Sequence, residues 1–151
     1  HRHHMAFSYA AFVASFFLRC ILVPTFFYEG TTKLLHKPHQ LQLFVRELKM
    51  DAFFLYPVGV YEVLVALMLM LKPRLGCFLL QLAMGGAMYA HIIRDDGQEW
   101  RVVVAILLSS CGAALGWVHA RSEHDLLHGV MLLMVGSFFT AAARYSTVCR
   151  A

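Results

Sequence analysis

Charged residues are scarce in this sequence, at 15% of its 151 residues, whereas apolar types make up 60%. Soluble domains carry about 25% charged and 45–50% apolar residues. A water-soluble domain is therefore excluded, and so is a disordered chain, which needs low hydrophobicity and a high net charge. With 4 cysteines and 10 glycines, the chain is neither a disulfide-rich scaffold nor a collagen. These absences leave an integral membrane protein with one compact domain.

Catalytic sequence motifs are missing as well. The chain has no G-x-S-x-G, Walker, H-E-x-x-H or dinucleotide-binding pattern. The cysteines at positions 20, 77, 111 and 149 form no C-x-x-C pair, which predicts free thiols rather than disulfides or a metal site. The net charge of +4 comes from basic residues in short connections between apolar runs, so no nucleic-acid partner is expected.

Five long apolar runs are present. Each is long enough, at 1.5 Å per helical residue, to cross a hydrocarbon core of about 30 Å. We therefore predict an all-α integral membrane helical bundle, with residues 1–151 forming a single domain in a lipid bilayer. The expected spans are residues 6–28, 53–71, 75–93, 102–118 and 126–143. We leave His1–Met5 out of the functional argument, because an expression scar or a processed end would look the same.

The longest connection contains a further helical pattern. Four apolar residues recur there at positions i, i+3, i+4 and i+7: Leu41, Phe44, Val45 and Leu48. Polar residues occupy the other positions, and Pro38 stands where a helix would begin. The pattern predicts a short amphipathic helix over 38–50 in the membrane interface. Plain interfacial packing and the docking of a partner remain the two interpretations.

The basic residues indicate an orientation. An odd number of spans places the two ends of the chain on opposite sides, which we call the first side (N-terminal) and the second side. The first side holds Arg2, Lys72, Arg74 and Arg121, and the second holds Lys33, Lys37, Arg46, Lys49, Arg94, Arg101, Arg144 and Arg150. The positive-inside rule then predicts the N-terminus out and the C-terminus in. The mitochondrial inner membrane and an endomembrane are both compatible with this pattern.

Two ionisable residues lie well inside apolar runs. Arg19 is in the first run and Glu62 is in the second, at a similar expected depth from the second side. An ionisable group in hydrocarbon costs several kcal/mol unless it is paired. We therefore predict an Arg19–Glu62 ion pair between the first two helices. A fixed pair that locks the bundle and a polar cavity for a ligand or lipid headgroup both remain open.

More polar residues are expected together near the second side. Glu29 and Lys33 are four residues apart and can pair on a helix. Tyr89 and His91, near the end of the third span, should lie at the same depth in the membrane as Glu29 and Lys33. Such a cluster could hydrogen-bond a quinone headgroup or relay a proton, although a structural role for the histidine is the simpler interpretation. No cofactor is firmly implied, and a quinone or a bound lipid is the candidate.

A second pair of histidines lies near the first side. His124 and His128 are spaced i, i+4 and face the same way, which is compatible with a metal ion. No second ligand pair accompanies them, so they are weak candidates and we expect no metal site.

Small residues indicate where helices pack. Gly112 and Gly116 form a G-x-x-x-G pattern in the fourth span, and Gly86 and Ala90 are four apart in the third. Small residues let helix backbones approach closely in lipid. Packing within the bundle is the simpler interpretation, and docking on a partner or on a second copy is the other.

Several of these residues together resemble a known family. Arg19, the segment YEGTTKL at 28–34, YEVL at 61–64 and GAMYAH at 86–91 have the order and spacing of the DoxX-like family of small four-helix membrane proteins. The resemblance extends over about residues 15–118, and it is strongest to the branch that includes the nicotinic-receptor assembly chaperone. The fifth span departs from the usual four.

The resemblance implies several roles and no single mechanism. Our first hypothesis is a non-catalytic accessory, structural or assembly subunit of a larger membrane complex, respiratory or organellar, with other membrane subunits as partners. The alternatives are a quinone- or lipid-binding membrane subunit of an oxidoreductase and a chaperone for a receptor or channel. Enzymatic activity of the chain itself is not expected.

Overall fold

The computed structural model describes residues 2–93, 100–120 and 124–148, and over these residues the regular structure is helical throughout. Long apolar segments become helices because every backbone amide in hydrocarbon must find its partner within the segment. Five helices are long and apolar enough to cross a membrane. The predicted all-α membrane bundle with five spans is therefore confirmed.

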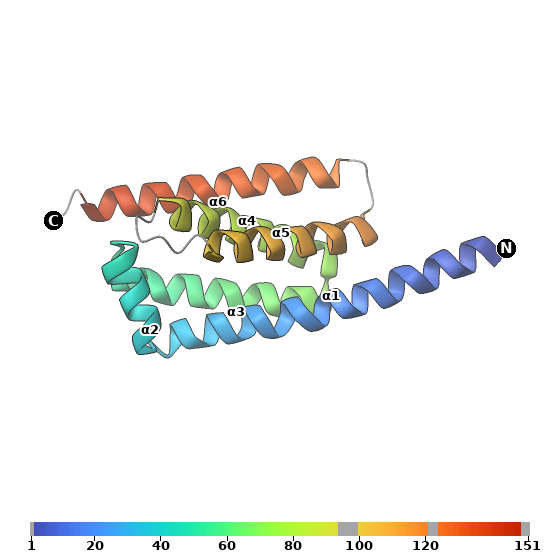
Figure 1. Ribbon diagram of the computed structural model, residues 1–151, viewed down its shortest axis with the longest axis horizontal. Coiled ribbons are helices and arrows are strands. Elements are labelled where there is room, and N and C mark those ends of the chain that lie inside the picture. Colours follow the sequence, from blue (N-terminus) through green and yellow to red (C-terminus); the bar gives the residue numbers. More distant parts are fainter. Residues whose placement is uncertain (1, 94–99, 121–123, 149–151) are drawn as a thin grey trace.

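Four of the long helices form a closed unit, and the fifth is added to its outside (Figure 1). The five are α1 (Arg2–Leu34), α3 (Leu55–Leu71), α4 (Pro73–Ile92), α5 (Trp100–Val118) and α6 (Asp125–Val148). Within the unit, α1 packs along α3, α3 on α4, α4 on α5, and α5 against α1. Helix α6 packs mainly along α4 and meets α5 only sparsely.

The apolar core lies inside the four-helix unit. Each of its four helices contributes at least one fully buried residue to this core, among them Leu22 from α1, Val65 from α3, Leu80 from α4 and Leu115 from α5. No described residue of α6 is buried there, although Leu133 packs against the cluster from outside. The four-helix unit is therefore the stable centre of the molecule.

Helix α1 is longer than the sequence predicted. It begins at Arg2 and continues past Glu29 and Lys33 to Leu34, whereas the expected span was 6–28. Its 33 residues correspond to about 50 Å at 1.5 Å per residue, more than the hydrocarbon core of about 30 Å. The N-terminal part of α1 accordingly extends beyond the other helices (Figure 1).

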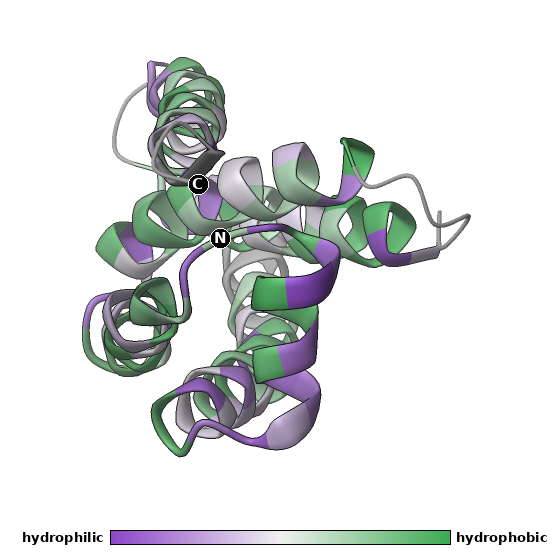
Figure 2. Cartoon of the chain, turned by 90° about the vertical axis from the view of Figure 1, so that its left-hand side faces the viewer, coloured by the Kyte–Doolittle hydropathy of each residue, from purple (hydrophilic) through white to green (hydrophobic). Residues whose placement is uncertain are grey.

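A short helical segment crosses the second side of the bundle (Figures 1 and 2). It consists of α2 (Pro38–Leu41) and the π-helix η1 (Gln42–Glu47), and the 3-10 helix η2 (Ala52–Phe54) then leads into α3. Figure 2 shows hydrophilic residues along this α2–η1 segment in the foreground.

The predicted apolar stripe of the α2–η1 segment is divided between two faces. Phe44 and Leu48 are buried against the bundle, whereas Leu41 and Val45 are exposed. The cause is the π-helix, in which Leu48 N–H bonds to Leu43 C=O, so one turn takes more residues than in an α-helix.

The orientation of the chain stays a prediction. Arg94, Arg121 and Arg150, which enter the count of basic residues, lie outside the described residues.

Candidate functional site

The most deeply buried charge of the described chain lies between α1 and α3 on the second side. Lys33 is 6% exposed, and its Nζ atom lies 2.7 Å from Oε2 of Glu62 on α3. The same ammonium lies 3.2 Å from Oε2 of Glu29, one turn earlier on α1. Lys33 thus bridges two carboxylates, and the three residues form an ion network that joins the two helices.

The α2–η1 segment closes this ion network from outside. Gln40 is 3% exposed and donates from Nε2 to Glu29 Oε2 at 2.9 Å and to Thr32 Oγ1 at 3.3 Å. Glu29 is the most open member, with 43% of its side chain exposed. Protein atoms therefore cover Lys33 and Glu62, and the network reaches the protein surface through Glu29.

Two glycines bring the charged residues together. A Cβ atom added to Gly30 would lie 2.8 Å from the Gly59 carbonyl oxygen, and one added to Gly59 would lie 2.9 Å from that of Gly30. The backbones of α1 and α3 therefore touch at this level, as small residues permit in membrane helices. This contact places Glu62 within reach of Lys33.

The predicted Arg19–Glu62 pair is wrong, because Lys33 occupies the position expected for Arg19. The Gly30–Gly59 contact sets Glu62 level with the end of α1, and Arg19 lies eleven residues earlier, about 16 Å away at 1.5 Å per residue. The Arg19 Nε atom instead donates to the Ser15 carbonyl at 3.4 Å. The depth expected from the sequence was wrong because α1 starts and ends elsewhere than the predicted span.

Arg19 lies close to the first side, beside His119. The Nε2 atom of His119 is 2.9 Å from the hydroxyl of Ser15, which is 2% exposed. Partial burial lowers the pKa of His119 below 6.5, and the nearby Arg19 cation lowers it further. His119 is therefore a neutral hydrogen-bonding link between α1 and the end of α5.

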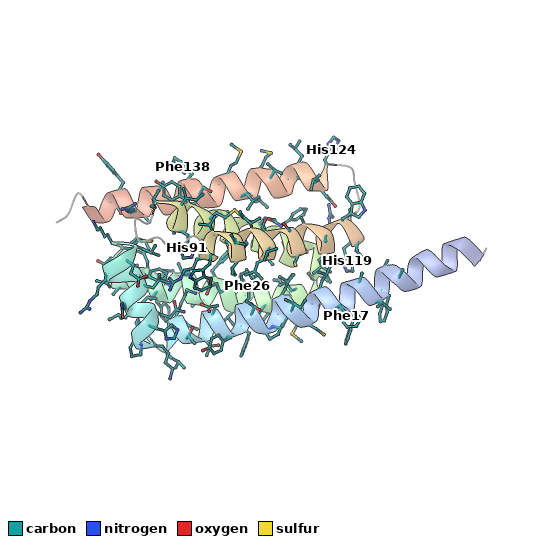
Figure 3. All side chains as sticks on the ribbon, viewed as in Figure 1. Phe17, Phe26, His91, His119, His124 and Phe138 are labelled. Carbon is teal, nitrogen blue, oxygen red and sulfur yellow. The ribbon has the colours of Figure 1, made fainter. Side chains whose placement is uncertain are left out.

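Tyr89 and His91 lie in the last turn of α4 and are partly buried. His91 shares a helix face with Met84 and Met88, which pack in the main core, so it faces the four-helix unit rather than α6. Figure 3 shows His91 and His119 toward opposite ends of the bundle. Neither Tyr89 nor His91 contributes to the ion network of Lys33 as the structure describes it.

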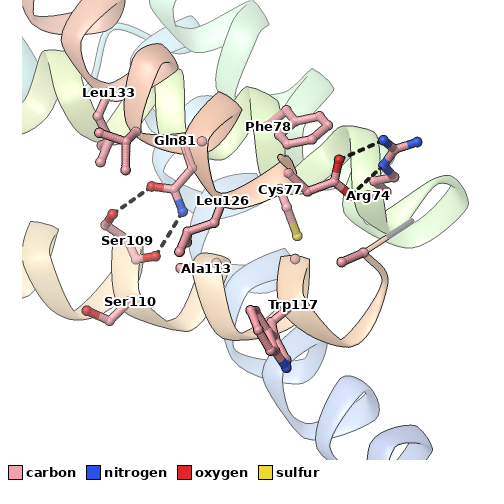
Figure 4. A pocket seen from close by; sticks show the side chains of 16 residues that line it. Arg74, Cys77, Phe78, Gln81, Ser109, Ser110, Ala113, Trp117, Leu126 and Leu133 are labelled. Atoms are coloured by element: carbon pink, nitrogen blue, oxygen red, sulfur yellow. Dashed lines mark hydrogen bonds and ion pairs between the residues drawn. The ribbon is translucent and has the colours of Figure 1, made fainter. Parts of the chain in front are cut away.

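A cavity lies elsewhere, among α4, α5 and α6 (Figure 4). Its volume is about 500 Å³. Helix α4 forms its floor, and α5 and α6, which meet only sparsely, form its walls. Exposed lining residues continue along both walls, from Trp117 to Ser110 on α5 and as far as Val130 on α6. The cavity therefore opens sideways, toward lipid in a membrane.

Two pairs of polar side chains lie in this cavity (Figure 4). Near the middle of α4, Gln81 Nε2 donates to the Ser109 carbonyl at 2.9 Å, and Ser109 Oγ donates to Gln81 Oε1 at 2.7 Å. At the first side, Arg74 donates to both carboxylate oxygens of Asp125, at 3.1 and 2.8 Å. The cavity thus has an uncharged polar pair deep inside it and an ion pair at its first-side end.

The predicted packing residues lie in two different surroundings. Gly112 packs tightly on α4, because an added Cβ atom would lie 2.5 Å from Leu80 Cδ2, whereas Gly116 has ordinary spacing and lines the cavity. Gly86 faces Thr140 and Gly136 on α6, and Ala90 is buried in a second apolar cluster with Phe44 and Leu48.

The tightest crossing involves residues that the sequence analysis did not name. Gly85 lies against the backbone of Leu133, and Gly136 against that of Leu82, so α4 and α6 touch directly. A small-residue pattern spread over two helices could have indicated this contact.

The histidines proposed as weak metal candidates are on the surface. His124 and His128 are exposed, and the His128 ring stands edge-on to Phe78 with centroids 6.3 Å apart. Among the described residues, no group of three or more His, Cys, Asp or Glu side chains is placed to hold a metal ion.

A comparison with known families agrees with this architecture. The model of the DoxX-like family matches residues 17–114, more than half of the chain, from the middle of α1 to the last turns of α5. The match therefore covers most of the four-helix unit and leaves out α6. Searches of the curated proteins and of the solved structures found no match. Matched over most of the unit that carries its core and over its entire ion network, this integral membrane chain belongs to the DoxX-like family.

Proposed function

We propose that this chain is a non-catalytic membrane subunit that holds a lipid- or quinone-like molecule in the cavity among α4, α5 and α6. The observation that carries the proposal is a cavity of about 500 Å³ that opens sideways and contains a polar pair at depth. Ligand pockets of roughly 300–1,000 Å³ that are mostly apolar and contain a few placed polar groups are typical of small-molecule sites.

The cavity supports this function better than the ion network does. Lys33 is already held by two carboxylates, and Gln40 covers the network from outside. The charged groups of the ion network thus bind one another, whereas the cavity has room for a ligand. A ligand between α5 and α6 would also fill the region where those helices make few contacts.

Extraction of the purified protein tests this function. The full chain, purified in mild detergent, should retain about one amphipathic molecule per chain, identified by mass spectrometry of the extract. Ala113→Phe places a ring among the lining residues and should remove that molecule. Ala114→Phe is the matched control, because Ala114 is exposed and does not line the cavity. Equal retention by the two variants would contradict the proposal.

A second candidate function is that of an accessory or assembly subunit of a larger membrane complex, and α6 favours it. Helix α6 lies outside the matched residues, and only Asp125 and Gly136 of its described side chains are buried. Its outer face carries Met134 and Phe138, at 69% and 70% exposure. Aromatic residues and methionine are enriched in protein interfaces. A chaperone role and a respiratory or organellar location stay predictions.

Two phenylalanine pairs give this second function a matched test. Phe138–Phe139 on α6 and Phe16–Phe17 on α1 are both exposed neighbouring pairs. If α6 binds other subunits, replacing its pair with leucines should shift the chain from a large complex to the monomer in native gels of solubilised membranes. The same replacement on α1 should leave the complex intact. A free monomer already present for the unmodified chain would exclude this role.

A further inference from the structure

The described lining residues of the cavity among α4, α5 and α6 carry no net charge. Its only charged lining residues among those described are Arg74 and Asp125, which neutralise each other through two hydrogen bonds. Asp125 is 8% exposed and also lies in the first turn of α6, where the helix dipole favours a negative charge. A charged ligand would therefore find no counter-ion here unless it broke this pair, and an unpaired charge inside a membrane is costly.

The polar pair at depth retains hydrogen-bonding capacity. A glutamine amide has two N–H donors and an oxygen with two lone pairs. In Gln81, one donor is directed to the Ser109 carbonyl and the oxygen accepts from the Ser109 hydroxyl. One donor and one lone pair of Gln81 thus remain. Gln81 is 5% exposed and lines the cavity, so these groups are available to a bound molecule rather than to bulk water.

The dimensions of the cavity limit the size of its ligand. The lining extends over seven residues along α4 and over eight along each of α5 and α6, which is about 10–12 Å at 1.5 Å per residue. An acyl chain that spans one leaflet needs about 15 Å, half of the roughly 30 Å hydrocarbon core. The cavity therefore suits a compact molecule better than a two-chain phospholipid.

We infer that the cavity binds one uncharged, compact amphipathic molecule whose carbonyl or hydroxyl group lies against Gln81 and Ser109. The remainder of the molecule occupies the apolar part of the cavity and leaves through the gap between α5 and α6. This inference rests on the proposed function and adds to it the charge, the size and the orientation of the ligand.

Photoreactive probes of one chain length test the charge of the ligand. Three short-chain diazirine probes would carry an alcohol, a carboxylate or an ammonium headgroup, and labelling of the purified full chain in nanodiscs would be mapped by peptide mass spectrometry. The alcohol should label cavity peptides of α4, α5 and α6 at a concentration at least tenfold lower than the other two. Ala113→Phe should abolish this labelling, and Ala114→Phe should leave it intact.

Two variants test the orientation of the ligand. Gln81→Leu should weaken labelling by the alcohol about tenfold, and Gln42→Leu, at an exposed residue of η1, should not change it. If Gln81→Leu does not fold, Ser109→Ala removes the hydroxyl of the pair and should also weaken labelling. Unchanged labelling by the alcohol in a folded variant would overturn the assigned orientation.

The outcomes separate this inference from the proposed function. If the carboxylate or the ammonium probe labels the cavity as well as the alcohol does, the charge inference fails and the proposed function stands. If no probe labels the cavity above the level of Ala113→Phe, the proposed function itself fails.

Discussion

The contact between α1 and α3 and the gap between α5 and α6 show opposite uses of small residues. At the first, Gly30 and Gly59 bring two backbones into contact, and a buried ion network closes the junction. At the second, Gly116 and Gly129 border a cavity, because no large side chain from the facing helix fills the space they leave. A glycine in a membrane helix therefore indicates close packing only when atoms of the partner helix fill the space opposite it.

The two regions also differ in how they balance charge. Lys33 is shared between two carboxylates, so the ion network depends on its single cation. At the cavity, Arg74 donates two hydrogen bonds to Asp125 at the first-side end, and the polar pair at depth is uncharged. Substitutions should consequently reduce the free energy of unfolding strongly in the first region and only slightly in the second.

The largest expected effect is that of Lys33→Met, which leaves Glu62 buried without its cation. Breaking a buried pair on one side costs about 3–5 kcal/mol, and we expect a loss of that order in the free energy of unfolding by SDS titration. Lys37→Met, at an exposed position, is the matched control. The double variant K33M/E62M should recover most of the loss. A Lys33→Met variant as stable as the control would show that the network does not hold α1 to α3.

An alanine at either glycine contrasts the two regions directly. Gly59→Ala puts a Cβ atom 2.9 Å from the Gly30 carbonyl oxygen, and forcing the helices apart should cost about 1–3 kcal/mol. Gly129→Ala puts its Cβ atom 3.7 Å from Gln81 Cγ, an ordinary contact, and should be neutral or slightly stabilising. The same SDS titration measures both. Equal losses would mean that the cavity is closed in the folded protein.

A smaller effect is expected from removing the polar pair of the cavity. Hydrogen bonds between membrane helices contribute about 0.6 kcal/mol on average, so Gln81→Leu should reduce stability by about that amount. A loss comparable to that of Lys33→Met would instead give this pair the structural role that we assign to the ion network.

The smallest effect concerns pH and the contact between α1 and α5. Because partial burial and Arg19 lower the pKa of His119 below 6.5, the unfolded chain binds more protons than the folded one just below that pH. The stability that neutral His119 contributes is full above about pH 6.5 and is lost as the pH falls toward the lowered pKa. The melting-temperature difference between the unmodified chain and His119→Gln should therefore shrink between pH 8 and pH 5. A melting-temperature difference that grew as the pH fell would contradict the lowered pKa of His119.

The sequence predicted the number of spans because hydrophobicity and length determine it directly. It did not predict the end of α1, because the expected span stopped with the apolar run at residue 28, before Glu29 and Lys33. They are accommodated in the helix by a partner, Glu62, that lies 29 positions after Lys33 in the sequence. The pairing of Glu62 with Arg19 was wrong for the same reason. Depth was counted from the ends of apolar runs, whereas the contact of Gly30 with Gly59 sets the actual register.

The cavity could not be predicted from the sequence, because it depends on where α6 docks. Five apolar spans of similar length do not reveal whether the last one packs on α4 or on α5. The direct contacts of Gly85 with Leu133 and of Gly136 with Leu82 hold α6 on α4 and leave α5 aside. Gln81 belongs to no sequence motif that marks a site, and its pairing with Ser109 becomes visible only in the folded chain.

The docking of α6 on α4 has a consequence for comparisons among relatives. Five of the described residues that line the cavity belong to α6, which lies beyond residue 114, where the match to the family ends. A relative built from four helices alone would offer only a shallow open trough at this place. A ligand site here would then depend on α6, and similarity over the four-helix unit would not by itself transfer it to another member.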